Sequence, residues 1–133
     1  MRHSLVSHAL AALLLLTSAA AWAADAPATQ AVQQYVYVLK LVPRLHDDKA
    51  WTAADQASVQ KHFMRLKEAT DRGEVIFAGR TNEPGDKTFG LVVFEATDEA
   101  AARAFMEADD AVKSGVMTAT LHPYLLVLQR KSG

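Results

Sequence analysis

The feature that most limits the fold is the order of two helix-like and four strand-like stretches in the last hundred residues. Stretches rich in aliphatic, β-branched and aromatic residues favour strands at 34–42, 75–78, 89–95 and 116–128. Helical spacing and end signals favour helices from Thr52 to Gly73 and over about 98–107, the second capped by Thr97. The order is therefore β-α-β-β-α-β, which predicts an α+β domain of the ferredoxin-like type.

The first predicted helix has clear local signals. Thr52 and Asp55 fit a capping box at its start, and Gly73 fits a left-handed stop at its end. Between them, four residues at three- and four-residue spacings predict the face that packs inward, namely Val59, Phe63, Leu66 and Thr70.

The predicted sheet has more apolar residues than two helices can cover. The strand at 34–42 is almost continuously apolar, which is typical of a central strand buried on both faces. Two helices cover only one face of a four-stranded sheet, so the other face is either solvated or paired. We expect a homodimer formed through this open sheet face.

The N-terminus has the pattern of a secretory signal over residues 1–23. Arg2 precedes an apolar run at 9–16, and Ala21-Trp22-Ala23 provides a small-x-small cleavage pattern. The run is too short for the ~20 residues of a membrane span; the alternative reading is a retained N-terminal anchor helix. We expect an exported protein, periplasmic or secreted, with a lead-in at 24–33, a folded domain at 34–130 and no membrane association after cleavage.

Charge and composition exclude several function classes. The chain has 14 Lys and Arg against 15 Asp and Glu, a net charge of −1, so it lacks the basic surface that nucleic acid binding requires. It contains no cysteine, which excludes thiol nucleophiles and Cys-ligated zinc or iron–sulfur sites. Its glycines form no phosphate-binding loop, so we expect no nucleotide cofactor.

The histidines are the main candidates for chemistry. His62 lies between Val59 and Leu66 in helical spacing, beside the inward face, where an imidazole needs a hydrogen-bond partner. A carboxylate partner would suit a general base; the alternative is a core-edge histidine bound to a backbone carbonyl. His46 with two neighbouring aspartates is weak evidence for a metal, and we expect none.

Particular motifs resemble the YciI-like (YCII-related) proteins. They are Lys61-His62-Phe63 followed by Gly73, the run Val75-Ile76-Phe77-Ala78-Gly79, then Gly90 and Phe94, and finally the segment 107–115 before the last strand. The resemblance implies a dimeric α/β-barrel fold and a pocket in which His62 and Asp109 form an acid/base pair.

Two positions depart from the family pattern. The usual Asp-Pro-Phe is Asp109-Asp110-Ala111 here, and the usual Ala-Gly-Pro is Ala78-Gly79-Arg80. Asp109 and Asp110 follow the second helix, where the negative end of the helix dipole disfavours carboxylates, so a local partner such as His62 is expected. The alternative for this pair is a solvated acidic turn. Arg80 is a candidate to bind a substrate carboxylate, against the reading of a solvated cation at a strand end.

Two functions are consistent with these residues. One is a cofactor-free lyase or isomerase that uses the His62–Asp109 pair on a small organic acid. The alternative is a non-catalytic module that binds a small ligand, or a structural dimer with no ligand. The sequence therefore predicts the fold and a candidate pair of residues, and it leaves the choice between catalysis and binding open.

Overall fold

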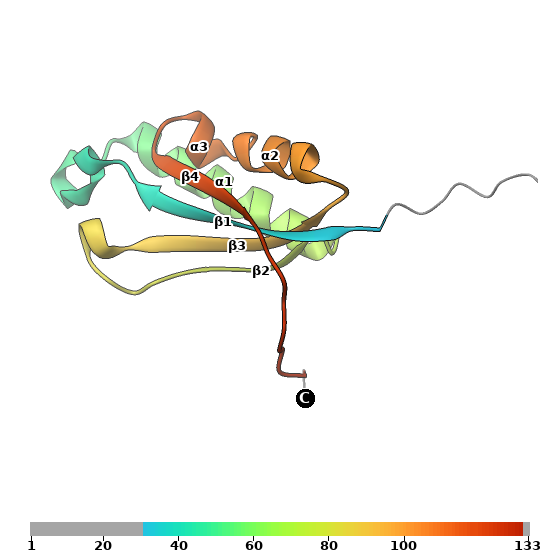
Figure 1. Ribbon diagram of the computed structural model, residues 1–133. Helices are drawn as coiled ribbons and strands as arrows, with labels where there is room; N and C mark the ends of the chain where they lie inside the picture. Colours follow the sequence, from blue (N-terminus) through green and yellow to red (C-terminus); the bar gives the residue numbers. More distant parts are fainter. Residues whose placement is uncertain (1–30, 132–133) are drawn as a thin grey trace, which may run out of the picture.

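The computed structural model describes residues 31–131, which form one sheet with helices packed against it (Figure 1). The predicted signal at 1–23 and most of the lead-in at 24–33 lie outside the described residues. The strands are β1 (Gln33–Leu41), β2 (Val75–Arg80), β3 (Phe89–Ala96) and β4 (Met117–Pro123). The helices are α1 (Ala53–Asp71), α2 (Glu99–Glu107) and α3 (Asp110–Lys113), with 3₁₀ turns η1 (Pro43–His46), η2 (Asp48–Ala50) and η3 (Gly85–Lys87).

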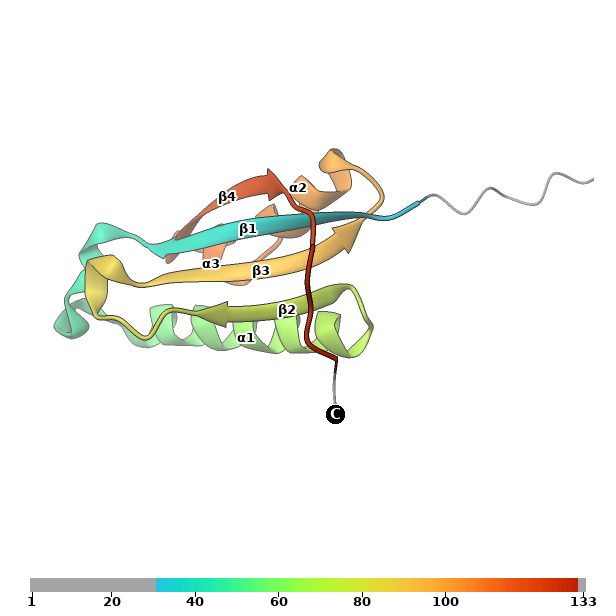
Figure 2. The ribbon, with the colours of Figure 1, turned by 60° about the horizontal axis from the view of Figure 1, so that its bottom comes forward.

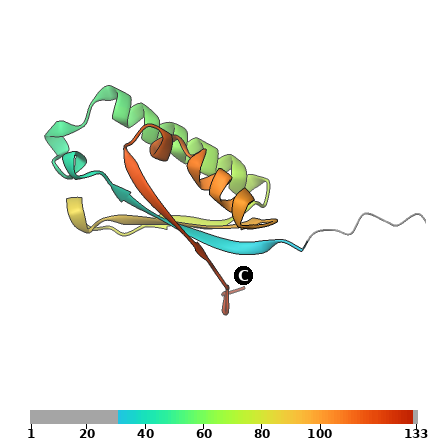
Figure 3. The same cartoon turned by 45° about the horizontal axis from the view of Figure 1, so that its top comes forward.

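The sheet confirms the predicted ferredoxin-like α+β class. Its strand order is β2-β3-β1-β4, and every neighbouring pair is antiparallel. Strands β2 and β4 are the two edges. The α-helices lie together on one side of the sheet, as the view in Figure 3 shows, so the other face is left open.

Helix α1 begins and ends as the sequence predicts, but its predicted inward face is only partly correct. Thr52 and Asp55 form the capping box, and Gly73 has the left-handed φ of 81°. Leu66 and Ala69 are the buried apolar residues of the helix, whereas Phe63 is 63% exposed. The expected burial of Leu66 and Val59 is observed in full and in part, respectively. The expected inward positions of Phe63 and Thr70 are wrong, because the buried stripe passes through His62 and Ala69 instead.

The second half of the fold differs from the prediction at two helix ends. Helix α2 is capped by Asp98, whose carboxylate accepts from the amide of Ala101, and not by Thr97. A third short helix, α3, follows at once and begins with Asp109 as its N-cap. Asp109 therefore faces the amide end of a helix, where a carboxylate is stabilised, in addition to following the C-terminus of α2.

Strand β1 is buried on one face only within a single chain. Tyr35, Tyr37 and Leu39 are buried towards the helices, where Phe94 and Phe105 stack with ring centroids 4.6 Å apart. The alternate residues Gln34, Val36 and Val38 are half-buried on the open face. The expected burial of β1 on both faces is therefore not observed in the isolated chain.

The last strand is shorter than the predicted 116–128. Strand β4 ends at Pro123, the Tyr124 amide donates to the carbonyl of Gln34, and the chain then leaves the sheet. We call residues 124–131 the C-terminal arm. Figures 1 and 2 show that the arm extends from the open side of the sheet, away from the helices.

Candidate active site

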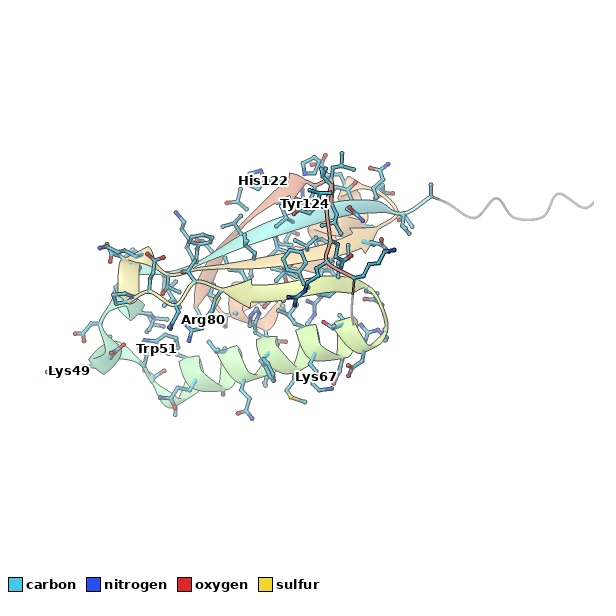
Figure 4. All side chains as sticks on the ribbon, turned by 90° about the horizontal axis from the view of Figure 1, so that it is seen from below. Lys49, Trp51, Lys67, Arg80, His122 and Tyr124 are labelled. Carbon is cyan, nitrogen blue, oxygen red and sulfur yellow. The ribbon has the colours of Figure 1, made fainter. Side chains whose placement is uncertain are left out.

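A cavity of about 680 Å³ lies between helix α1 and strands β1, β2 and β3. In Figure 4, Arg80 lies at the end of β2 and Lys67 on α1, the two elements that border the cavity. Its walls are mainly apolar, with contributions from Leu39, Val59, Leu66, Val92 and Met117, and His62 is one of its polar residues. An apolar cavity with a few polar groups is the usual form of a small-molecule site.

His62 and Asp109 are in direct contact beside this cavity. The His62 Nδ1 atom lies 2.7 Å from Oδ1 and 2.8 Å from Oδ2 of Asp109. His62 comes from the middle of α1 and Asp109 from the N-cap of α3, so the contact joins two helices. The Asp109 side chain is fully buried, whereas part of the imidazole remains accessible. The structure thus brings together the two residues that the family resemblance pairs.

Tyr37 is a third member of this group, and the sequence reasoning missed it. Its hydroxyl donates to Oδ2 of Asp109 at 2.8 Å, and the backbone amide of Ala111 donates to Oδ1 at 3.0 Å. Asp109 therefore accepts from an imidazole, a phenol and an amide. A signal was present in the sequence, because a tyrosine in a central apolar strand needs a buried partner for its hydroxyl.

The charge state of the group follows from these contacts. Burial alone raises the pKa of Asp109, but the hydrogen bond and charge of His62, the Tyr37 hydroxyl and the Ala111 amide together lower it below its ordinary value. Burial and the neighbouring Asp109 raise the pKa of Tyr37 far above its ordinary value. Asp109 is thus a carboxylate and Tyr37 a neutral donor, so Nδ1 of His62 must carry the proton that it shares with Asp109.

Arg80 lines the same cavity but is separate from the pair. Its side chain is exposed, and Nη1 donates to the carbonyl of Thr81 at 3.4 Å. Among the described residues, Arg80 makes no hydrogen bond to His62 or Asp109. The guanidinium therefore lies at the rim of the cavity.

Comparison with known proteins identifies the domain. A family model described as the YCII-related domain matches residues 34–121.

The chain belongs to the YCII-related family.

Among solved structures, the chain is similar to 5-chloro-2-hydroxyhydroquinone dehydrochlorinase (TftG) from Burkholderia phenoliruptrix AC1100, determined in complex with 2,5-dihydroxybenzoquinone. The identity is 16%, the match covers 69% of this chain and 93% of that chain, and the TM-score is 0.49. No curated protein matches the chain significantly.

The YCII-related match contains all the candidate site residues described above. Tyr37, His62, Arg80 and Asp109 all lie within it, whereas the C-terminal arm at 124–131 lies beyond its end. Asp110 and Ala111, which depart from the family pattern, form the start of α3 and leave the Asp109 cap intact. The loss of the usual proline at position 80 leaves β2 paired with β3 as far as Arg80.

Arg65 is a second residue that the sequence reasoning did not single out. Its Nη2 donates to the carbonyl of Phe105 at 2.9 Å, and its guanidinium lies 4.3 Å from the centre of the Phe105 ring. Its positive charge also lowers the pKa of Tyr37, against the larger upward effects of burial and Asp109. Arg65 therefore joins α1 to α2 beside the group and packs on the aromatic core.

The other polar residues considered from the sequence have local structural contacts. His46 Nε2 lies 3.2 Å from the carbonyl of Leu41, and Asp47 caps η2 through the amide of Lys49. Across residues 31–131, no three His, Asp or Glu side chains converge in a way that could hold a metal ion. No helix in that same range is both long and apolar enough to cross a bilayer.

Proposed function

We propose that this domain is an acid/base enzyme of the lyase or isomerase class that acts on a small organic acid. The observation that carries the proposal is the His62–Asp109 contact beside an apolar cavity. A carboxylate on Nδ1 fixes the imidazole tautomer and leaves Nε2, with its lone pair, for a ligand. Such an arrangement is typical of a general base.

The reaction step assigned to His62 is a proton transfer. Nε2 takes a proton from a carbon of the substrate, and the electron pair of the broken C–H bond forms a new C=C bond. In a lyase the adjacent leaving group departs, while in an isomerase the proton returns at another carbon. Asp109 stabilises the imidazolium that forms, and the step needs no cofactor. General base catalysis of this kind contributes about 10²–10⁴-fold to the rate.

Arg80 supports the choice of an organic acid. A guanidinium at the rim of an otherwise apolar cavity favours a molecule with a carboxylate or phenolate at one end and an apolar body. The substrate bound in this way would place its apolar part near Leu39 and Leu66. Arg80 therefore acts as a binding residue rather than a catalytic one.

The test is conversion of small organic acids followed by NMR over time, with the wild-type chain, His62→Ala and a control variant. His46→Gln is the control, because His46 contacts the carbonyl of Leu41, does not line the cavity and lies in η1, outside the sheet. We expect turnover that falls by about 10²-fold or more in His62→Ala and persists in the control. A ligand that binds the wild-type chain and returns unchanged would instead support the non-catalytic binding module.

We further infer that the domain forms a homodimer through the open face of its sheet. The face carries Val36, Val38 and Leu91, which are only half-buried in one chain, and Phe77, which is 41% exposed. Covering such apolar surface is the general driving force for subunit association. The concentration dependence of thermal unfolding, argued in the Discussion, tests this inference.

Export to the periplasm or the medium is also a proposal, supported by the signal pattern at 1–23. Fusion of residues 1–25 to a reporter enzyme tests it. We expect the reporter to leave the cytoplasm, and retention of the reporter inside the cell would contradict the proposal.

A further inference from the structure

Arg65 is a charged residue of helix α1 that takes no part in the reaction step described above. It follows His62 by one helical turn and is half-buried. Its Nη2 donates to the carbonyl of Phe105 at 2.9 Å, and its guanidinium lies 4.3 Å from the centre of the Phe105 ring. These two contacts hold the planar guanidinium against α2, so the fold fixes where its positive charge lies.

The same guanidinium lies beside Tyr37. The rings of Phe105 and Tyr37 meet edge to face with their centroids 6.4 Å apart. Burial and Asp109 raise the pKa of Tyr37, and the Arg65 guanidinium acts in the opposite direction. Nη1 of Arg65 is buried and has no hydrogen-bond partner within residues 31–131. Because an unpaired buried donor is unfavourable, the attraction of this cation to the neighbouring hydroxyl and carboxylate is the compensation that the fold offers.

A hydroxyl between a cation and a carboxylate has one favoured orientation. The lone pairs of the Tyr37 oxygen face the guanidinium, and its hydrogen points to Oδ2 of Asp109, 2.8 Å away. Asp109 in turn contacts Nδ1 of His62 at 2.7 Å. The order of the chain is therefore Arg65, Tyr37, Asp109 and His62, with both ends on α1. Groups in such a chain polarise one another, so the positive charge at one end strengthens the donation from Tyr37 to Asp109.

The need for a neutral imidazole explains why a cation belongs in this chain. A carboxylate in contact with an imidazole favours the imidazolium ion. A general base, however, must begin without the proton that it is to accept. A permanent cation that acts on the same carboxylate offsets this effect. Arginine is suited to that task, because it stays charged throughout the pH range in which histidines titrate.

The charged groups on the cavity side of His62 do not provide this charge. Lys67 forms an ion pair with Asp71, and Arg80 is exposed at the rim. Of these cations and Arg65, only Arg65 acts on Tyr37.

The charged groups on the outer side of Arg65 border solvent, where charges are screened. A shallow depression there is lined by Arg65 together with one more cation and two carboxylates, namely Lys61, Glu68 and Asp110. Glu74, which precedes β2 and also senses the charge of Arg65, is paired with Arg72. The buried side of the guanidinium therefore faces the group around Asp109.

From these observations we propose that Arg65 is a positioning residue for the reaction: acting through Tyr37 and Asp109, it keeps His62 neutral and able to accept a proton near neutral pH. The proposal rests on the role of His62 as the base in the proposed function, and it adds the residue that sets the pH range in which this base works. Arg65 does not line the cavity, so its effect reaches a substrate only through the chain.

NMR titration of the histidine side chains tests the proposal without a substrate. The full-length chain is compared with Arg65→Gln, and the His62 signals are assigned from their loss in His62→Ala. We expect the midpoint of the His62 titration to move upward by about half a pH unit or more in Arg65→Gln. Arg103→Gln is the matched control, because the exposed guanidinium of Arg103 on α2 pairs only with Glu99, and its midpoint should equal that of wild type. An unmoved midpoint in Arg65→Gln, or an equal shift in the control, would overturn the proposal.

Two further variants separate the charge of Arg65 from its packing. Arg65→Met keeps an apolar stem against Phe105 and removes the charge, so it carries the same prediction if Arg65→Gln does not fold. Arg65→Lys keeps a positive charge, and its midpoint should lie nearer to that of wild type. Equal upward shifts in the methionine and lysine variants would show that packing is responsible and would overturn the proposal.

The pH dependence of kcat/KM gives the second readout, with any substrate that the domain converts. The activity of a general base rises with pH as the base loses its proton, so the acidic side of the profile should move to higher pH in Arg65→Met by the amount seen in the NMR titration. A merely structural role would lower the rate at every pH and leave the position of the profile unchanged. Full turnover in His62→Ala would refute the proposed function itself. An inactive His62→Ala together with an unmoved midpoint in the Arg65 variants would refute the role of Arg65 alone.

Discussion

Asp109 contributes both to the stability of the fold and to the candidate active site. It caps α3, accepts from Tyr37 and fixes His62, so one buried carboxylate joins β1, α1 and α3. A buried charge with three donors is stable only while all three remain in place. The same contacts that make His62 a candidate base therefore also stabilise the domain, and substitutions here affect both properties.

Asp109→Asn is expected to change how the free energy of unfolding depends on pH in the acid range. The native pKa of Asp109 lies below its ordinary value, so its contribution is complete above about pH 4 and is lost as the pH falls through the native pKa. We expect the variant to be less stable at pH 7 by about 1–3 kcal/mol, and the difference from wild type to shrink below about pH 4. Urea unfolding from pH 7 to pH 3 measures this. Asp55, whose pKa is also lowered, is present in both proteins and cancels from the difference. A difference that is constant across this range would contradict the assignment.

Tyr37→Phe separates the contribution of the hydroxyl to stability from that of the aromatic ring. The substitution keeps the buried aromatic packing and removes one donor to a carboxylate, a loss of about 1.5–3 kcal/mol in unfolding free energy. Tyr35→Phe is the control, since Tyr35 is buried on the same face of β1 and its hydroxyl contacts only the neutral side chain of Gln33. The control is expected to lose about 0.5–1.5 kcal/mol. Equal losses in urea unfolding would show that the Tyr37 hydroxyl has no special role.

At the residue scale, sequence reasoning found the pair but not its surroundings. Helical spacing placed His62 next to the buried stripe, and the family resemblance supplied Asp109 as its partner; the structure brings the two into contact. Tyr37 and Arg65 were missed because their contacts are made across elements far apart in sequence. Spacing reports which residues share a helix face and gives no information on which strand residue lies opposite.

At the scale of secondary structure, local signals predicted helix ends better than helix faces. The capping box of α1 and the glycine at its end involve residues close in sequence, so they are visible there. The inward face depends on where α1 lies over the sheet, so the spacing alone assigned Phe63 to it wrongly, and Phe63 is exposed. Likewise, β4 ends where its backbone pairing with β1 ends, at the hydrogen bond from the Tyr124 amide to Gln34. The apolar residues that follow Pro123 do not extend it.

Thr52→Ala tests the capping box as a stabilising element. The Thr52 hydroxyl accepts from the Asp55 amide and donates to the Asp55 carboxylate, and alanine at an N-cap lacks both contacts. We expect a loss of about 1 kcal/mol in unfolding free energy, recovered mainly by Thr52→Ser. Thr70→Ala near the other end of α1 is the matched control, because there the hydroxyl bonds only to the carbonyl one turn earlier. That substitution is expected to be neutral or slightly stabilising, since alanine favours helix interiors. Equal effects of the two alanines, measured by urea unfolding, would contradict a capping role.

At the scale of the whole molecule, the two faces of the sheet have different partners. The helices cover one face with a continuous core that includes Tyr37, Val92 and Phe94. The open face retains apolar residues that no helix within residues 31–131 covers, and the C-terminal arm extends from the same side. A domain that completes its second face with another copy is stabilised by association, so its stability depends on protein concentration.

Val38→Lys tests this dependence. Val38 lies at the centre of the open face, on the middle strand β1 and between Leu91 of β3 and Thr120 of β4, so a lysine there puts an unpaired charge into the proposed interface. We expect the thermal unfolding midpoint of the wild-type chain to rise with protein concentration and that of the variant to be independent of it. Gln60→Lys, on the exposed side of α1, adds the same charge away from the sheet and should retain the wild-type behaviour. Because burying an isolated ammonium group is far more costly than leaving it in water, the variant should remain monomeric while its own core stays intact. Circular dichroism of the variant checks that core. A wild-type midpoint that does not change with concentration would mean that the open face is used in some way other than pairing with a second copy.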